Sequence, residues 1–252
     1  MLKRRIIPIQ LLSRSRLVKT RKFKNPRDVG DPIMSSRVYS NQDADELILL
    51  NIDRVEDSLD SLLETTSNIL KECFVPFTVG GGIRSLNDAE KLFATGADKV
   101  VINTMALKKP TLISEIAESA GSQALVVGID VRFNNGEYVV YSDCSETAEK
   151  IKLSQHIQNI ITLGAGEILI QSIDRDGEMQ GYDLDLLEKV ISESDIPVIS
   201  AGGAGNFKHL FDAFEIGVDA VACGSLFNFG DNNPLRAKAF LKNLGVPLKK
   251  IK

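Results

Sequence analysis

Two glycine-rich stretches carry residue types suited to binding phosphate. VGGGIRS occupies residues 79–85 and its near copy AGGAGNF occupies residues 201–207; each follows a short apolar run and precedes a helical pattern. Glycines at the end of a strand let backbone N–H groups approach a phosphate, and the N-terminus of the next helix adds a favourable dipole. Two such sites would suit a ligand with a phosphate at each end. The alternative is that the glycines serve only tight turns.

The two stretches belong to an internal repeat with an offset of 121 residues. Its paired positions include Gly81 and Gly202, Gly82 and Gly203, Asn103 and Gly224, and Thr104 and Ser225. Hydroxyl residues share the last of these pairs, which favours two related phosphate sites over two unrelated turns. A repeat of about half the chain predicts internal two-fold symmetry, with halves at about residues 1–121 and 122–252.

The strands that must position these residues are short apolar runs, as expected for parallel strands buried on both faces. Eight runs alternate with helical patterns, at residues 6–12, 46–52, 75–79, 99–104, 125–131, 167–173, 196–200 and 219–224. This alternation predicts a single (β/α)8 barrel, a TIM barrel, over residues 1–252. Such barrels place their active sites at the carboxyl ends of the strands, and both glycine-rich stretches occupy such ends.

Capping and turn residues mark the connections between the strands. Asp31 and Ser85 each precede a helical pattern as N-cap residues. Helical spacing also covers residues 55–70 and residues 146–163. An Asn-Gly pair between alternating residues predicts a hairpin inserted at about residues 132–142, after the fifth strand.

Residues 13–27, SRSRLVKTRKFKNPR, hold seven Arg or Lys and no acid. A charged run of this kind is often only a solvated loop. Here it follows the first predicted strand, so it lies at the active-site end of the barrel. We therefore interpret it as a flexible cationic lid over an anionic substrate.

The composition argues against several classes of function. The net charge of −4 and the pI of about 5.4 argue against binding to nucleic acid or to a membrane. The apolar start of the chain breaks at Gln10 without a small-residue cleavage site, so we interpret it as the first buried strand. The odd number of cysteines predicts a reduced, cytoplasmic setting. Cys73, Cys144 and Cys223 lack metal-type spacing, and only two histidines are present, so we expect no metal and no cofactor.

Several motifs together carry a family resemblance. VGGGIRS, GADKVVINT, GSQALVVGID, GAGEIL, SIDRDG, GYD and GGAG, in this order, closely resemble the cyclase subunit of imidazole glycerol phosphate synthase over nearly the whole chain. The resemblance implies a barrel that pairs with a glutaminase subunit. Ammonia from the glutaminase would enter the bottom of the barrel and cross its interior. At the top it would react with a bis-phosphorylated ribulosyl aminoimidazole ribotide, giving imidazole glycerol phosphate and an aminoimidazole carboxamide ribotide.

The resemblance also implies roles for individual residues. One phosphate site would comprise Gly82, Asn103 and Thr104, and the other Gly177, Gly203, Gly224 and Ser225, with Lys19 and Asp176 facing the substrate. A ring of charges at the ammonia entrance would comprise Arg5, Glu46, Lys99 and Glu167. Asp98 and Gln123 would face the glutaminase. The alternative for the ring is a structural layer of salt bridges, because residues at the bottom of a barrel often serve stability.

One member of the expected catalytic pair is missing. The resemblance implies general acid–base catalysis by two aspartates at the tops of strands one and five. Asp130 fills the strand-five place, but Leu11 holds the strand-one place and has no titratable proton. Asn51 also replaces an aspartate of the family, and SRS replaces its usual KDG turn after strand one.

These departures favour replaced chemistry. Our first hypothesis is an ammonia-channelling subunit that delivers ammonia for sugar amidation in surface-polysaccharide biosynthesis, together with a glutaminase and an ATP-dependent amidating enzyme. The alternative is a genuine cyclase subunit of histidine biosynthesis. A phosphosugar isomerase and a non-catalytic, phosphosugar-binding regulatory barrel are further readings; the four ring charges argue against the isomerase.

Overall fold

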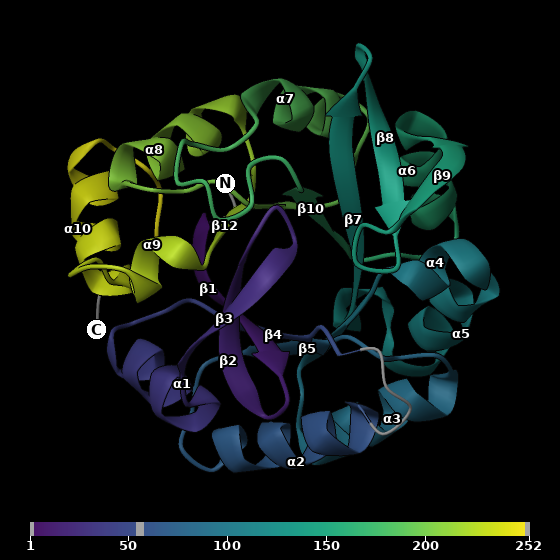
Figure 1. The fold of residues 1–252 in the computed structure, drawn as a ribbon, viewed down its shortest axis with the longest axis horizontal. Helices are drawn as coiled ribbons and strands as arrows, with labels where there is room; N and C mark the ends of the chain where they lie inside the picture. Colours follow the sequence, from purple (N-terminus) through teal and green to yellow (C-terminus); the bar gives the residue numbers. More distant parts are fainter. Residues whose placement is uncertain (1–2, 54–57, 250–252) are drawn as a thin grey trace.

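Eight parallel strands form a closed barrel in the structure, a computed structural model that describes residues 3–53 and 58–249 (Figure 1). The strands are β1 (Arg5–Ser13), β4 (Leu47–Asn51), β5 (Phe77–Gly80), β6 (Lys99–Ile102), β7 (Leu125–Asn134), β10 (Glu167–Ser172), β11 (Val198–Ala201) and β12 (Ala220–Cys223). Each pairs with the next along the chain, and β12 pairs with β1 to close the barrel. The predicted (β/α)8 barrel is confirmed.

Helices surround the barrel (Figure 1). They are α1 (Pro32–Asn41), α2 (Ser58–Leu70), α3 (Leu86–Thr95), α4 (Thr104–Lys108), α5 (Thr111–Ala120), α6 (Leu153–Thr162), α7 (Leu184–Ser192), α8 (Phe207–Ile216), α9 (Ser225–Asn228) and α10 (Pro234–Asn243), with a 3-10 turn at Ser122–Ala124. The predicted caps are confirmed: the Asp31 side chain accepts from the Met34 N–H, and Ser85 forms a capping box with Asp88. Residues 55–57 of the helix predicted over 55–70 lie outside the described residues. No helix in the described ranges is long and apolar enough to cross a membrane.

Strand side chains point alternately into the barrel and toward the helices. The barrel interior is filled by an apolar layer that includes Ile7, Ile48, Val101, Leu169 and Ile199, all buried. The outward-pointing side chains form the larger core with the helices. This division explains why the strands have apolar residues at consecutive positions.

The basic segment 13–27, which we interpret as a cationic lid, forms a β-ribbon rather than an irregular loop. β2 (Arg16–Arg21) pairs antiparallel with the end of β1, and β3 (Lys24–Gly30) pairs antiparallel with β2. Leu17 and Val18 are buried, which anchors β2 to the barrel. The ribbon lies over the barrel mouth in Figure 1. Basic residues flank the short apolar pair Leu17-Val18 on both sides, so the segment has the composition of a solvated loop.

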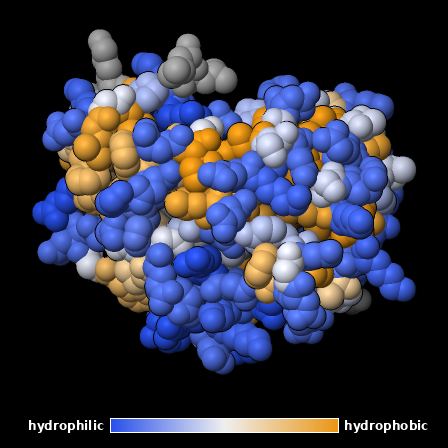
Figure 2. All heavy atoms as spheres, turned by 90° about the horizontal axis from the view of Figure 1, so that it is seen from above, coloured by the Kyte–Doolittle hydropathy of each residue, from blue (hydrophilic) through white to orange (hydrophobic). Residues whose placement is uncertain are grey.

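The helix predicted over residues 146–163 begins later. β7 turns at Asn135-Gly136 into β8 (Glu137–Ser142), and β9 (Thr147–Lys152) pairs antiparallel with β8 before α6 begins at Leu153. β9 is largely exposed at the edge of the sheet. Because β9 lies at the edge and buries neither face, its sequence lacks the alternating apolar pattern of a strand. The apolar spacing of the following helix therefore extended the prediction back over it. Hydrophilic residues predominate among those visible at the lower side of Figure 2, where the carboxyl end of the barrel lies.

Matching hydrogen bonds occur in the two halves, consistent with the predicted repeat. The Asp98 carboxylate accepts from the Phe77 N–H at 2.8 Å, and the Asp219 carboxylate accepts from the Val198 N–H at 3.0 Å. Both pairs are related by the offset of 121 residues. Each carboxylate thus fixes the start of the preceding strand in its own half.

Candidate functional site

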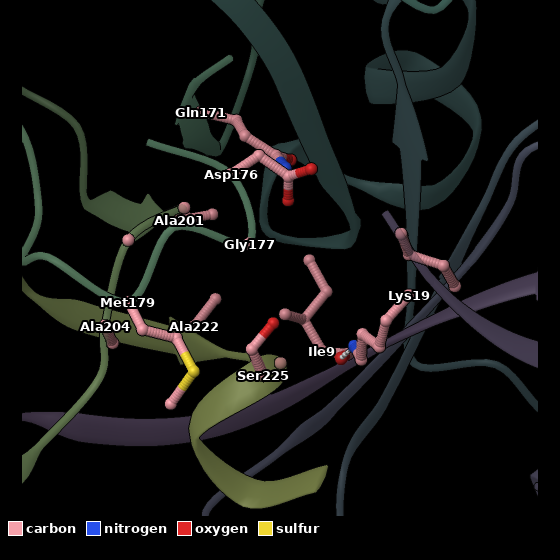
Figure 3. Close-up of a pocket in the computed structure, with 14 residues that line it drawn as sticks. Ile9, Lys19, Gln171, Asp176, Gly177, Met179, Ala201, Ala204, Ala222 and Ser225 are labelled. Carbon is pink, nitrogen blue, oxygen red and sulfur yellow. Dashed lines mark hydrogen bonds between the residues drawn. The ribbon is translucent and has the colours of Figure 1, made fainter. Parts of the chain in front are cut away.

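A cavity opens at the carboxyl end of the barrel, where the ends of β1, β10, β11 and β12 meet the ribbon (Figure 3). Its lining includes eight residues singled out from the sequence: Leu11, Lys19, Asp176, Gly177, Gly202, Gly203, Gly224 and Ser225. They come from segments up to about 200 residues apart in the chain, and only closure of the barrel brings them together.

Glycines shape the wall of this cavity because larger residues would not fit. Gly177 has a φ of +69° and a Cβ there would collide with the carbonyl oxygen of Thr20. Gly203 has a φ of +117°, and a Cβ there would collide with the carbonyl oxygen of Gly181. At Gly224 a Cβ would lie 2.5 Å from the Nζ atom of Lys19. Bare backbone therefore lines the place where a phosphate would bind.

Lys19 brings a buried amine to this cavity. It lies on β2, only 6% exposed, and its Nζ donates to the carbonyl oxygen of Ile9 at 2.8 Å. Burial lowers the pKa of Lys19 to about 8, against the opposing influence of Asp176 and Cys223. The amine can therefore exchange a proton near neutral pH, as well as attract an anion.

Asp176 connects the cavity to the ribbon. Its Oδ2 accepts from the Thr20 hydroxyl at 2.7 Å and from the Phe23 N–H at 3.1 Å. Burial raises the pKa of Asp176, while these two hydrogen bonds and the charge of Lys19 oppose the rise. The carboxylate therefore both faces the cavity and holds the ribbon over it.

Asp130 lies beside this cavity, near the carboxyl end of β7. Asn103 donates from Nδ2 to its Oδ2 at 2.8 Å. Burial raises the pKa of Asp130 to about 7; the hydrogen bond from Asn103 lowers it and the charge of Asp176 raises it further. A carboxyl group with this pKa is suited to both accept and donate a proton at neutral pH. Leu11 lines the cavity from β1 and offers no such group.

The residues of the other predicted phosphate site lie outside the lining of this cavity. Gly82 has a φ of +77° after β5, and Asn103 follows β6 beside Asp130. The Thr104 hydroxyl accepts from the Asp143 N–H at 3.0 Å, and Lys108 binds the Asp143 carboxylate at 2.9 Å. The turn between β8 and β9 therefore covers Thr104.

Four charged side chains form a closed ring at the amino end of the barrel. Arg5 contacts Glu46 and Glu167, each at 2.9 Å, and Lys99 contacts Glu46 at 3.1 Å and Glu167 at 2.9 Å. Burial lowers the pKa of Arg5, but Glu167 and Glu46 raise it more, so that the net shift is upward. The two cations and two anions thus neutralise one another across the barrel entrance.

Asp98 and Gln123, predicted to face a partner, lie at the same end as the ring. Both are exposed. Asp98 precedes β6 and Gln123 precedes β7, where its Nε2 donates to the carbonyl oxygen of Ala120 at 3.2 Å.

Comparison with known proteins identifies the family. The family described as "Histidine biosynthesis protein" matches residues 5–233. The chain is 42% identical over 250 residues to imidazole glycerol phosphate synthase subunit HisF of Chlorobium limicola, covering 99% of this chain and 100% of that protein. It is 40% identical over 249 residues to the subunit of the same name from Thermococcus gammatolerans, covering 99% of each. The chain belongs to the histidine biosynthesis protein family.

Membership of this family favours the alternative to our first hypothesis. The similar proteins bear the name of the synthase subunit, which favours the cyclase alternative over sugar amidation. They give no support to an ATP-dependent amidating partner or to a place in a polysaccharide pathway.

Two residues of this family member near the site were missed from its sequence. Gln171 lines the cavity and stands in register with Asp130 on the neighbouring strand. A glutamine inside the apolar run EILIQSI was a usable signal for it. Thr20, which holds Asp176, had no such signal because its position depends on the ribbon.

Potential metal ligands do not gather in this family member. Among residues 3–53 and 58–249, no group of three or more His, Cys, Asp or Glu is arranged to hold a metal ion. His156 is buried, and that burial lowers its pKa to about 4.

Proposed function

We propose that this chain is the ammonia-using cyclase subunit of an imidazole glycerol phosphate synthase and works with a glutaminase subunit. The observation that carries the proposal is the pairing of two features at opposite ends of one barrel. A neutralised ring of Arg5, Glu46, Lys99 and Glu167 lies at the amino end, and a glycine-lined cavity lies at the carboxyl end. The similar proteins named above support the same reading.

The barrel interior suits ammonia better than ammonium. Between the ring and the cavity lies the apolar layer of Ile7, Ile48, Val101, Leu169 and Ile199. An apolar lining penalises a charged species far more than a small neutral molecule. Ammonia that passes the ring would therefore reach the top unprotonated, the form that can act as a nucleophile.

At the carboxyl end, the glycine-lined cavity would bind one phosphate of the substrate, and the region of Gly82 and Asn103 would bind the other. Asp130 would then exchange protons with the imidazole ring as it closes, since its pKa of about 7 permits both directions. The second proton carrier must differ from the one that the family resemblance implies, because Leu11 cannot serve. Lys19 and Asp176 are the titratable groups that line the cavity.

The test is an assay of the purified chain with the bis-phosphorylated ribotide. Nitrogen would be supplied as glutamine with the co-encoded glutaminase, or as an ammonium salt without it. We expect product from both sources, and Asp130→Asn to lower turnover about 10²–10⁴-fold, the usual contribution of one acid–base group. Consumption of the ribotide by neither route would contradict the cyclase proposal.

One observation favours a second candidate, an ammonia conduit whose acceptor is bound by another enzyme. Leu11 faces the cavity where the resemblance implies an acid. In that case the barrel would still stimulate the glutaminase, but the ribotide would not be consumed. The comparisons favour the cyclase, so we place the conduit second.

A further inference from the structure

A phenylalanine is exposed at the amino end of the barrel. Phe74 is 88% exposed, the largest fraction among the exposed large apolar side chains of the described residues. It lies in the connection between α2 and β5, three residues before β5 begins. Helix C-termini and strand N-termini meet at this end of a barrel, so Phe74 lies on the same face as the charged ring. Covering a side chain of this size with another apolar surface is favourable.

The internal repeat shows that the fold does not require an aromatic side chain at this position. The offset of 121 residues aligns residues 72–76, ECFVP, with residues 193–197, ESDIP. Asp195 is thus the counterpart of Phe74, and it is also exposed, in the equivalent connection between α7 and β11. The same type of connection therefore forms with a carboxylate in the place of the phenyl ring.

Phe74 shares an arc of this face with Asp98 and Gln123. The three residues lie in consecutive connections, which lead into β5, β6 and β7, and these strands are neighbours in the barrel. Asp98 and Gln123 are exposed and polar. An apolar residue bordered by polar ones is the usual anatomy of an interaction hot spot. The arc also adjoins the ring, since Glu46 immediately precedes β4 and Lys99 begins β6, on either side of β5.

We propose that Phe74 anchors the glutaminase subunit on this arc by inserting its ring into an apolar pocket of that partner. The inference rests on the proposed function, which supplies the glutaminase as the occupant. Docking on the arc places the partner next to Glu46 and Lys99. Ammonia released there would meet the ring before bulk water.

The test is a calorimetric titration of the co-encoded glutaminase with the full-length barrel. We compare the unmodified chain with Phe74→Ala, with Phe74→Asp, and with the matched control Phe133→Ala. Phe133 is 55% exposed on the hairpin at the opposite end of the barrel. We expect Phe74→Ala to raise Kd about 30-fold, the effect of truncating a hot-spot residue, and Phe74→Asp to raise it further. Phe133→Ala should leave Kd within about twofold, as expected outside an interface.

The outcomes separate the inference from the proposed function. Thermal unfolding midpoints of both Phe74 variants should match the unmodified chain, because Asp195 occupies the equivalent position without harm. If Phe74→Ala binds the glutaminase as tightly as the unmodified chain, or if Phe133→Ala weakens binding equally, the anchor is refuted while the proposed function stands. If the unmodified chain binds no glutaminase at all, the proposed function fails, and the anchor fails with it.

Discussion

Asp130 is held in surroundings that favour its protonated form. Its folded-state pKa of about 7 lies above the ordinary value of 3.8, chiefly because the carboxyl group is buried. The folded protein therefore binds this proton more tightly than the unfolded chain does. As a result, the free energy of unfolding contributed by Asp130 falls as pH rises from about 4 to about 7, and it stays low above that range.

Replacing Asp130 by Asn should remove this dependence on pH. At pH 8 we expect Asp130→Asn to be more stable than the unmodified chain by up to about 4 kcal/mol, since each pKa unit corresponds to about 1.4 kcal/mol. At pH 5 the difference should be much smaller. Thermal unfolding of both proteins at several pH values measures it, and a difference that does not change with pH would contradict the raised pKa.

At Leu11 the opposite substitution, adding an acid instead of removing one, tests the second proton carrier. Leu11→Asp would place a second titratable group at the cavity, and we expect turnover of the ribotide to rise about 10-fold or more, within the range for one acid–base group. Leu11→Asn is the matched control, with similar size and polarity but no proton to exchange. Equal turnover by all three proteins would show that another group, such as Lys19 or Asp176, already supplies the second proton.

At the scale of elements, the ribbon of β2 and β3 forms part of the site. It brings Lys19 to the cavity, and Asp176 fastens it through Thr20 and Phe23. Arg21 adds an ion pair with Glu178 at 3.2 Å, which contributes little because the Arg21 side chain is exposed to solvent. The carboxylate of Asp176 therefore adds to the attachment that pairing with β1 and the burial of Leu17 and Val18 provide.

Thr20→Val should loosen the ribbon while keeping its shape and its apolar contacts. It removes one hydrogen bond to a carboxylate, which we expect to cost about 1.5–3 kcal/mol locally. Trypsin should then cleave faster after the exposed residues Lys22 and Lys24, as followed by mass spectrometry. Thr95→Val, at a half-buried position in the last turn of α3 and far from the ribbon, is the control. Unchanged cleavage would mean that the hydrogen bond from Thr20 to Asp176 does not help to hold the ribbon.

At the scale of the whole molecule, the ring and the cavity occupy opposite ends of one filled barrel. Contacts within the ring span β1, β6, β10 and the residue before β4, so the ring also ties distant parts of the chain together. A structural role and a gating role predict different results when one member is removed.

Lys99→Met should separate these roles. It leaves Glu46 and Glu167 with only Arg5 as a ring partner, which we expect to cost about 1–3 kcal/mol, below the 3–5 kcal/mol of fully buried pairs. If the ring gates ammonia, glutamine-dependent turnover should fall more than turnover with an ammonium salt. Lys91→Met, at an exposed position on α3, is the control. Equal loss by both routes would assign the ring to stability alone.

Hydrophobic pattern alone determined most of the architecture. Apolar runs between helical patterns predicted the barrel, because parallel strands must bury both faces, and caps such as Asp31 and Ser85 act within a few residues of their own helix. The β2–β3 ribbon and β9 escaped prediction because they are held by pairing with neighbouring strands, which leaves a weak apolar pattern.

The sequence by itself also identified the glycine stretches, and the family resemblance singled out Asp130 and the absence of an acid at Leu11. Only the tertiary structure decided which of these residues meet. Lys19 reaches the cavity through the ribbon, Thr104 is covered by Asp143, and the pKa values of Lys19 and Asp130 shift because of burial. Periodicity reports which face of an element is buried, whereas the neighbours of a side chain depend on how the barrel closes.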